Sequence, residues 1–250
     1  MIDFNAKLGQ WPYRPMRGIE ALLETIEAFE MEWAVVSSLS AVHYLNPHDG
    51  NEELAKLIEP HRDCLIPFAV LKPHFALCEK DLEKCVAEYG MKGLVLYPNY
   101  HQFDLTDPSL RPLMEQAGAY GLPVCIQVGL EDPRRQFDRP LVPEVAAETV
   151  GAFARQYPEI QVVVLGLKFG QPEKMGESLP PNLKFDISNY EHLGELEYAV
   201  QQFGASCLLF GTNFPLFTPS ANIEKIRCAV LSEGDRRLIT HLNARHLLGL

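Results

Sequence analysis

Polar and apolar side chains alternate in the first residues of the chain. Asp3, Asn5 and Lys7 occupy every second position of an otherwise apolar run. Because side chains along a strand alternate between its two faces, these three residues should share one face. The other face is then made of Ile2, Phe4 and Ala6. We expect the apolar face to pack against helices and the polar face to point into a functional site.

Lys7 is the residue of this polar set that could take part in the widest range of reactions. Its ammonium could bind a carboxylate or polarise a carbonyl group. If the side chain were desolvated its pKa would fall, which opens nucleophilic or Schiff-base chemistry. The plainer alternative is an ion pair with a neighbouring carboxylate, or a side chain that reaches solvent. Asp3, by contrast, is expected to be a buried hydrogen-bonding residue rather than a base.

Two further amides stand at the ends of apolar runs. Gln127 ends the run on the same face as Cys125, and Asn213 follows another run on the same face as Gly211. Together with Asn5, these amides are candidates for orienting a substrate beside the lysine.

Basic residues occur in two of the expected loops. Trp11, Tyr13 and Arg14 follow the first run, and an arginine among aromatic rings suits a substrate carboxylate. Packing of the loop itself explains the same residues equally well. A second basic group could bind an anion or a partner, or form a solvated charged loop. Its members are Arg134, Arg135 and Arg139.

Three histidines follow successive apolar runs. His43, His74 and His101 could form an acid/base or metal site, or they could be ordinary loop histidines exposed to solvent. His101 is the best candidate for moving a proton, because Tyr97 and Tyr100 stand beside it.

The elements that would position these residues alternate along the chain. The eight predicted strands are Met1–Ala6, Trp33–Leu39, Cys64–Leu71, Gly93–Tyr97, Pro123–Val128, Gln161–Leu165, Asn182–Ile187 and Cys207–Gly211. The predicted helices are Ile19–Phe29, Asn51–Ile58, Phe75–Tyr89, Ser109–Tyr120, Val142–Tyr157, Glu191–Phe203 and Ala221–Ser232, with a short one between Gly170 and Pro180 and a closing one over Asp235–Leu250.

This alternation predicts an α/β fold, a (β/α)8 TIM barrel, in one domain over residues 1–250. A doubly wound open sheet is the competitor, but it usually has fewer strands. In such a barrel the functional face lies at the C-terminal ends of the strands.

Composition narrows the function. The chain has 250 residues, 47% of them hydrophobic and 22% charged, which is typical of a globular domain. With 22 Lys and Arg against 33 Asp and Glu, the net charge is -11, which disfavours nucleic acid or an anionic membrane as a partner. The 6 cysteines lack metal or redox spacing and fit small buried residues of a reducing compartment. No signal peptide or membrane span is predicted, so we expect a cytoplasmic protein.

Six segments carry a recognisable pattern. They are Ile2–Gly9, Asn51–Ala55, Gly90–Pro98, Gly121–Ile126, Leu209–Pro215 and Asn243–Leu250. In this order they resemble the amidohydrolase superfamily, and within it the amidohydrolase-related branch that includes aminocarboxymuconate-semialdehyde decarboxylase. The resemblance covers essentially the whole chain. It implies a metal-dependent-hydrolase-like barrel with a small-molecule site at its mouth.

The metal-binding positions that this resemblance implies carry other residues. The family's strand-one histidines fall at Asn5 and Lys7, its strand-five histidine at Gln127 and its strand-eight aspartate at Asn213. Its strand-six histidine falls near Leu167. Neutral amides are poor ligands for zinc and similar ions, and an ammonium repels them. We therefore expect no metal at this site and no other cofactor.

A count of local charges predicts an electrostatic role for Lys7. In the family, a divalent ion with one aspartate carries a local charge of about +1, and Lys7 with neutral Asn5 and Asn213 carries the same. Lys7 is therefore predicted to take the electrostatic place of the ion.

Two functions remain open at this point. The first is a metal-independent hydrolase or lyase for a small carboxylate-bearing substrate, with Lys7 and His101 as catalytic residues. Its substrate would be bound by Asn5, Arg14, Tyr97, Gln127 and Asn213. The second is a non-catalytic relative that binds a small anionic metabolite or an active homologue. A metalloenzyme built on His43, His74 and His101 is a third reading, and a homo-oligomer is possible under each.

Overall fold

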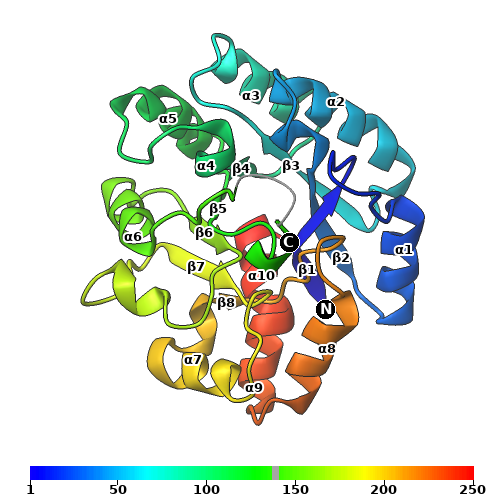
Figure 1. Cartoon of the computed structure of the whole chain (residues 1–250), viewed down its shortest axis with the longest axis vertical. Coiled ribbons are helices and arrows are strands. Elements are labelled where there is room, and N and C mark those ends of the chain that lie inside the picture. Colours follow the sequence, from blue (N-terminus) through cyan, green and yellow to red (C-terminus); the bar gives the residue numbers. More distant parts are fainter. Residues whose placement is uncertain (137–140) are drawn as a thin grey trace.

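A computed structural model of the chain describes residues 1–136 and 141–250. Eight parallel strands follow one another around a single sheet in chain order. They are β1 Ile2–Leu8, β2 Trp33–Ser38, β3 Leu65–Val70, β4 Leu94–Leu96, β5 Val124–Gln127, β6 Val162–Leu165, β7 Leu183–Asp186 and β8 Leu208–Leu209. The fold is the predicted (β/α)8 barrel (Figure 1).

The sheet closes between its last and first strands. The Phe4 amide donates to the Phe210 carbonyl at 2.9 Å, and the Lys7 amide donates to the Phe214 carbonyl at 2.8 Å. The segment after β8 therefore continues the pairing with β1 beyond the short strand itself, and it brings Asn213 beside the end of β1.

Helices form a ring outside the strands (Figure 1). The main ones are α1 Ile19–Ala28, α2 Pro47–Ile58, α3 Cys78–Ala87, α5 Arg111–Ala119, α6 Ala147–Gln156, α7 Glu195–Phe203 and α8 Pro219–Cys228. Between β6 and β7 there is a short 3-10 turn, Pro172–Met175, as the sequence suggests. Helix α6 begins later than its predicted start at Val142, and the four-residue helix α4, Pro98–His101, was not predicted.

β1 contains a bulge, because its register with β2 shifts between Asp3 and Ala6. Ile2 and Phe4 belong to the hydrophobic cluster inside the barrel, where Phe4 meets Phe68 of β3 with ring centroids 5.6 Å apart. Ala6 lies in the other cluster, between strands and helices. The prediction that all three apolar residues face the helices is therefore wrong for the first two, since a bulge reverses which side chains face inward.

Side chains fill the barrel. An internal cavity beside Asn5 and Phe68 has a volume of only about 10 Å³, no more than one water needs. The barrel is thus a packed core, and any ligand must bind at one of its ends.

The C-terminal segment covers the N-terminal end of the barrel. Helix α9, Glu233–Arg237, a π-helical turn over Leu238–Leu242 and helix α10, Asn243–Leu248, follow one another. The Asn243 amide donates to the Leu208 carbonyl at the start of β8 at 2.8 Å, and Ala244 packs into the inner cluster. This leaves the opposite end, the barrel mouth, for function. In the described part of the chain, no helix is both long and apolar enough to cross a membrane.

Candidate functional site

Lys7 lies at the barrel mouth with its side chain fully buried. Its Nζ donates to Asn5 Oδ1 and, at 2.9 Å, to Asn213 Oδ1. The two amides come from β1 and from the segment after β8, so the ammonium joins the strands at which the barrel closes. The sequence prediction that Asn5, Lys7 and Asn213 come together is what the structure shows.

Asp186, at the end of β7, is a further member of this network and was missed in the sequence. Its Oδ2 accepts from Asn5 Nδ2 at 2.8 Å, and its Oδ1 accepts from the Gly166 amide at 2.7 Å. Asn5 Nδ2 also lies 3.5 Å from Ser188 Oγ. The available signal was a lone carboxylate at the C-terminal end of an apolar strand, which in a barrel points to the functional face.

The predicted local charge of +1 around Lys7 counted neither Asp186 nor Asp3. Asp186 and Asp3 are both buried and both act electrostatically on the ammonium, so they compensate its charge. Burial lowers the pKa of Lys7 to about 8, against the opposing pull of these two carboxylates and of Cys125. Asp3 is the expected buried hydrogen-bonding residue, since it accepts from the Asn5 and Thr212 amides at 3.0 and 2.9 Å.

Gln127 and Asn213 are held by backbone carbonyls. Gln127 Nε2 donates to the Gly129 carbonyl at 2.7 Å, and its buried Oε1 has no hydrogen-bond partner among the described residues. Asn213 Nδ2 donates to the Leu130 carbonyl at 3.0 Å. The φ of Asn213 is 53°, in the left-handed region that Asn tolerates better than most residues. Each amide thus presents a fixed oxygen, and only that of Asn213 faces Lys7.

The loop after β1 covers the mouth. Trp11 is buried in the inner cluster with Leu130 and Leu216, and its Nε1 donates to Glu131 Oε1 at 3.1 Å. Arg14, predicted to bind a substrate carboxylate, lies 3.5 Å from the same Glu131 oxygen. This arrangement supports the loop-packing alternative for these residues.

Tyr97 and His101 lie side by side, with ring centroids 5.9 Å apart. Burial lowers the pKa of His101 to about 4 and raises that of Tyr97, so both rings are neutral at pH 7. A neutral imidazole can accept a proton, but the ring is buried rather than exposed in a loop.

The three loop histidines do not gather into one site. His74 Nε2 lies 3.1 Å from Asp107 Oδ2 at the surface, and His43 packs against Trp11 with ring centroids 4.6 Å apart. Over residues 1–136 and 141–250, no three His, Cys, Asp or Glu side chains are placed to hold a metal ion. Cysteines are free thiols, and the expectation that they are buried fails for Cys228, which is exposed.

Two cavities open beside the buried network. The larger has a volume of 630 Å³ and lies between the loops after β7 and β8 and helix α8. The smaller, of 440 Å³, lies over the ends of β5, β6 and β7 and is lined by Lys168, Phe169 and Asn189. Lys7 lines neither cavity.

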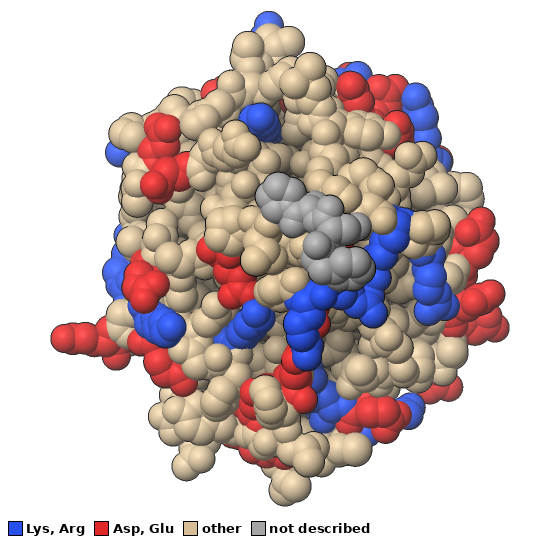
Figure 2. All heavy atoms as spheres, viewed as in Figure 1, with Lys and Arg blue, Asp and Glu red and all other residues tan. Residues whose placement is uncertain are grey.

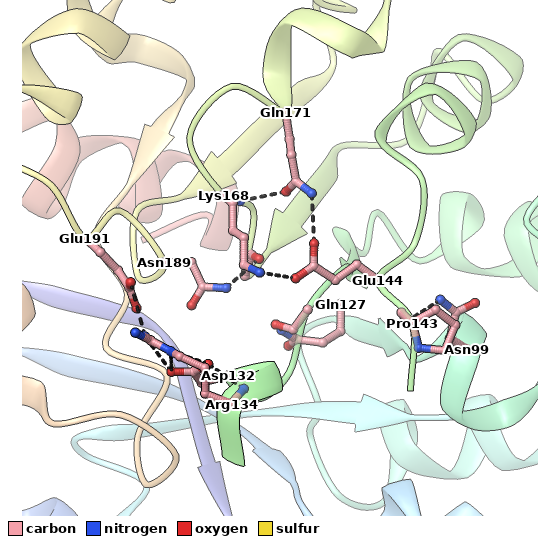
Figure 3. Close-up of polar contacts among 12 residues, drawn as sticks. Asn99, Gln127, Asp132, Arg134, Pro143, Glu144, Lys168, Gln171, Asn189 and Glu191 are labelled. Carbon is pink, nitrogen blue, oxygen red and sulfur yellow. Dashed lines mark hydrogen bonds and ion pairs between the residues drawn. The ribbon is translucent and has the colours of Figure 1, made fainter. Parts of the chain in front are cut away.

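An ion-pair bridge crosses between these cavities. Arg134 Nη2 lies 2.6 Å from Asp132 Oδ2 and 3.5 Å from Glu191 Oε2, so it links the loops after β5 and β7 (Figure 3). Arg134 is thereby an ion-pairing residue of a charged loop, and Arg139 lies outside the described residues. In the same view Asn189 Nδ2 donates to the Gly166 carbonyl at 2.7 Å.

The model of the Amidohydrolase family matches residues 3–250. The chain belongs to the amidohydrolase family. No curated protein matches its sequence. Leu167, near which the resemblance stated from the sequence implies the family's strand-six histidine, lies in the hydrophobic cluster outside the barrel.

Several solved structures share the whole fold of this chain. The 2,6-dihydroxybenzoate decarboxylase from Rhizobium has a TM-score of 0.77 at 18% identity over 99% of this chain and 98% of that one. The 5-carboxyvanillate decarboxylase from Sphingomonas paucimobilis has a TM-score of 0.77 at 14% identity over 100% and 98%. A dihydroxybenzoic acid decarboxylase from Polaromonas, with bound manganese and 2-nitroresorcinol, has a TM-score of 0.75 at 16% identity over 100% and 96%.

Proposed function

We propose that this amidohydrolase-family chain binds a small carboxylate-bearing molecule at its barrel mouth without a divalent metal ion and without turnover. The observation that carries the proposal is the Lys7 ammonium, fully buried and bonded to the amide oxygens of Asn5 and Asn213. In this proposal Lys7 is a structural cation that joins β1 to the segment after β8.

The donor set does not fit a divalent cation. By resemblance, Asn5, Lys7, Gln127 and Asn213 stand where the family has metal ligands. An ammonium only donates, and the two amide oxygens nearest to it already accept its protons. Zinc and manganese sites are built from imidazole, thiolate or carboxylate groups. A metal ion at this position is therefore no part of the proposed function.

Burial of the lysine favours binding over chemistry. A nucleophile or electrostatic catalyst must touch the reacting group, whereas Trp11, Leu130 and Leu216 pack over the mouth and Lys7 lines neither large cavity. A ligand held in one of these cavities does not reach the ammonium.

One observation favours a second candidate, a metal-independent lyase that uses Lys7 covalently. Because the pKa of Lys7 falls to about 8, about half of the amine is neutral at pH 8 and is able to condense with a ketone carbonyl, releasing water. The predicted hydrolase or lyase activity, with His101 moving the proton, belongs to this candidate.

Metal analysis and a decarboxylation assay test the proposal together. We expect far less than one equivalent of zinc, manganese or iron by plasma mass spectrometry after purification without chelator. Incubation with 2,6-dihydroxybenzoate, the substrate named for the Rhizobium relative, should release no carbon dioxide. One tightly held equivalent of metal would overturn the metal-free site. Carbon dioxide release that Lys7→Met abolishes and Lys56→Met retains would replace the binding role by the lyase.

A further inference from the structure

The 630 Å³ cavity beside helix α8 has the size of a small-molecule site, for which roughly 300–1,000 Å³ is usual. One wall is apolar and aromatic, with Leu216 and Phe217 from the loop after β8. Ser188, after β7, contributes a hydroxyl to the lining and lies 3.5 Å from the Asn5 amide, so the cavity adjoins the buried network.

Lys225 of α8 is the most enclosed cation of this cavity. Its Nζ donates to the Ile187 carbonyl at 2.6 Å and to Asn222 Oδ1 at 2.7 Å, which leaves one of its three protons for another acceptor. No described carboxylate lies within ion-pair distance of it. Burial lowers the pKa of Lys225 to about 8, against the pull of Asp186, Glu195 and Glu191.

Arg17 and Arg135 add two further cations to the lining. The Arg17 guanidinium lies 5.7 Å from the centroid of the Phe214 ring. On the face shown in Figure 2, blue basic side chains gather near the centre, over β1, with red acidic side chains beside them toward α8. These cations come from three separate loops or helices, so the fold rather than the local sequence assembles them.

The acidic residues of the lining are already paired with arginines that do not line the cavity. Asp132 and Glu191 lie 2.6 and 3.5 Å from Arg134 Nη2. Glu224 Oε1 lies 2.7 Å from Arg227 Nη1. Asp132 and Glu191 share the single charge of Arg134, so one carboxylate charge of the lining stays against the three cations Lys225, Arg17 and Arg135. The net charge that remains for a ligand is therefore positive, although the chain as a whole carries -11.

We propose that this cavity binds a small aromatic carboxylate, with the carboxylate on Lys225 and Arg17 and the ring against Leu216 and Phe217. This inference rests on the proposed ligand-binding role and gives it a place and a ligand class. The site differs from the buried Lys7 network, because its cations come from α8 and from the loops after β1 and β5. Charge-assisted hydrogen bonds to carboxylates are about twice as strong as neutral ones, which makes the charge the main source of affinity.

Calorimetric titration of the full chain with benzoate and with its neutral analogue benzamide tests this site. Benzoate should bind saturably and benzamide at least about tenfold more weakly. Lys225→Met and Arg17→Gln should each weaken benzoate binding about tenfold and leave benzamide unchanged. The matched control Lys56→Gln removes an exposed charge from α2, outside this cavity, and should change neither titration. Arg17 is exposed, so its variant tests the site even if Lys225→Met fails to fold.

A third variant, Arg227→Gln, should weaken benzoate binding. Arg227→Gln leaves Glu224 without its partner, so a free carboxylate then faces the cavity and benzoate binding should weaken. Benzoate binding that Lys225→Met and Arg17→Gln leave intact would place the ligand elsewhere and overturn this inference, while the proposed binding role would stand. Inorganic phosphate that competes as strongly as benzoate would overturn the choice of an aromatic carboxylate. Lys7-dependent carbon dioxide release would instead overturn the proposed function.

Discussion

Lys7 is surrounded by groups from β1, β5, β7 and the segment after β8. The amide oxygens of Asn5 and Asn213 accept its protons, and the carboxylates of Asp186 and Asp3 act on it electrostatically. A buried charge in such a network is costly to remove singly, because its partners then remain buried without it.

Lys7→Met should therefore destabilise the fold although methionine has nearly the same length. Two amide oxygens lose their donor, and a buried acceptor without a donor costs about 1–3 kcal/mol each. We expect the free energy of unfolding to fall by roughly 2–5 kcal/mol at pH 7, measured by urea denaturation followed by circular dichroism. Lys56→Met, at an exposed position, is the control. A loss below about 0.5 kcal/mol, the size of an ordinary surface effect, would contradict a structural role for the ammonium.

The same pair of proteins should differ in their response to pH. In the folded chain Lys7 releases its proton near pH 8, whereas its ordinary pKa is 10.5. Between these values the unfolded chain binds more protons, so the contribution of Lys7 to stability rises with pH. The difference in unfolding free energy between wild type and Lys7→Met should grow by up to about 1.4 kcal/mol per pH unit in this window. A difference that stays constant from pH 8 to 10 would refute the lowered pKa.

At the scale of elements, strand ends determine what meets at the mouth. Predicting the strands from sequence succeeds because strands of a parallel barrel are buried on both sides and form continuous apolar runs. The ends of β1 and β8 then bring Lys7 and Asn213 together without further information. The bulge of β1 was not predictable, because nothing in the residues between Asp3 and Ala6 marks it. Lys225 was missed because the packing of α8, rather than its sequence, decides which of its cations is partly enclosed.

At the end of β6, the packing leaves no room for a side chain. Gly166 has a φ of 73°, and a Cβ there would lie 2.7 Å from Gln127 Nε2 and closer still to the Gly129 carbonyl. Gly170 has a similar φ of 78°, but a Cβ there would meet nothing within 4 Å. Gly170→Ala should cost only the left-handed backbone strain of about 1–2 kcal/mol. Gly166→Ala should cost at least about 2 kcal/mol more, because backbone must move. If the two variants lose equal unfolding free energy in urea denaturation, the ends of β5 and β6 do not pack against each other as described.

At the scale of the whole molecule, stability should be independent of metal, because residues 1–136 and 141–250 hold no suitable set of metal ligands. A specific site filled to 100 times its Kd adds about 2.7 kcal/mol, which for a chain of this size raises the melting temperature by roughly 5–10 °C. We expect manganese to shift the melting temperature by less than about 1 °C relative to chelator, measured by calorimetry. The net charge of -11 attracts cations without a specific site, so calcium at the same concentration is the control. The manganese-bound Polaromonas decarboxylase is the positive comparison. A manganese shift of several degrees that calcium does not reproduce would mean that this barrel holds a metal ion, and that Lys7 does not take its place.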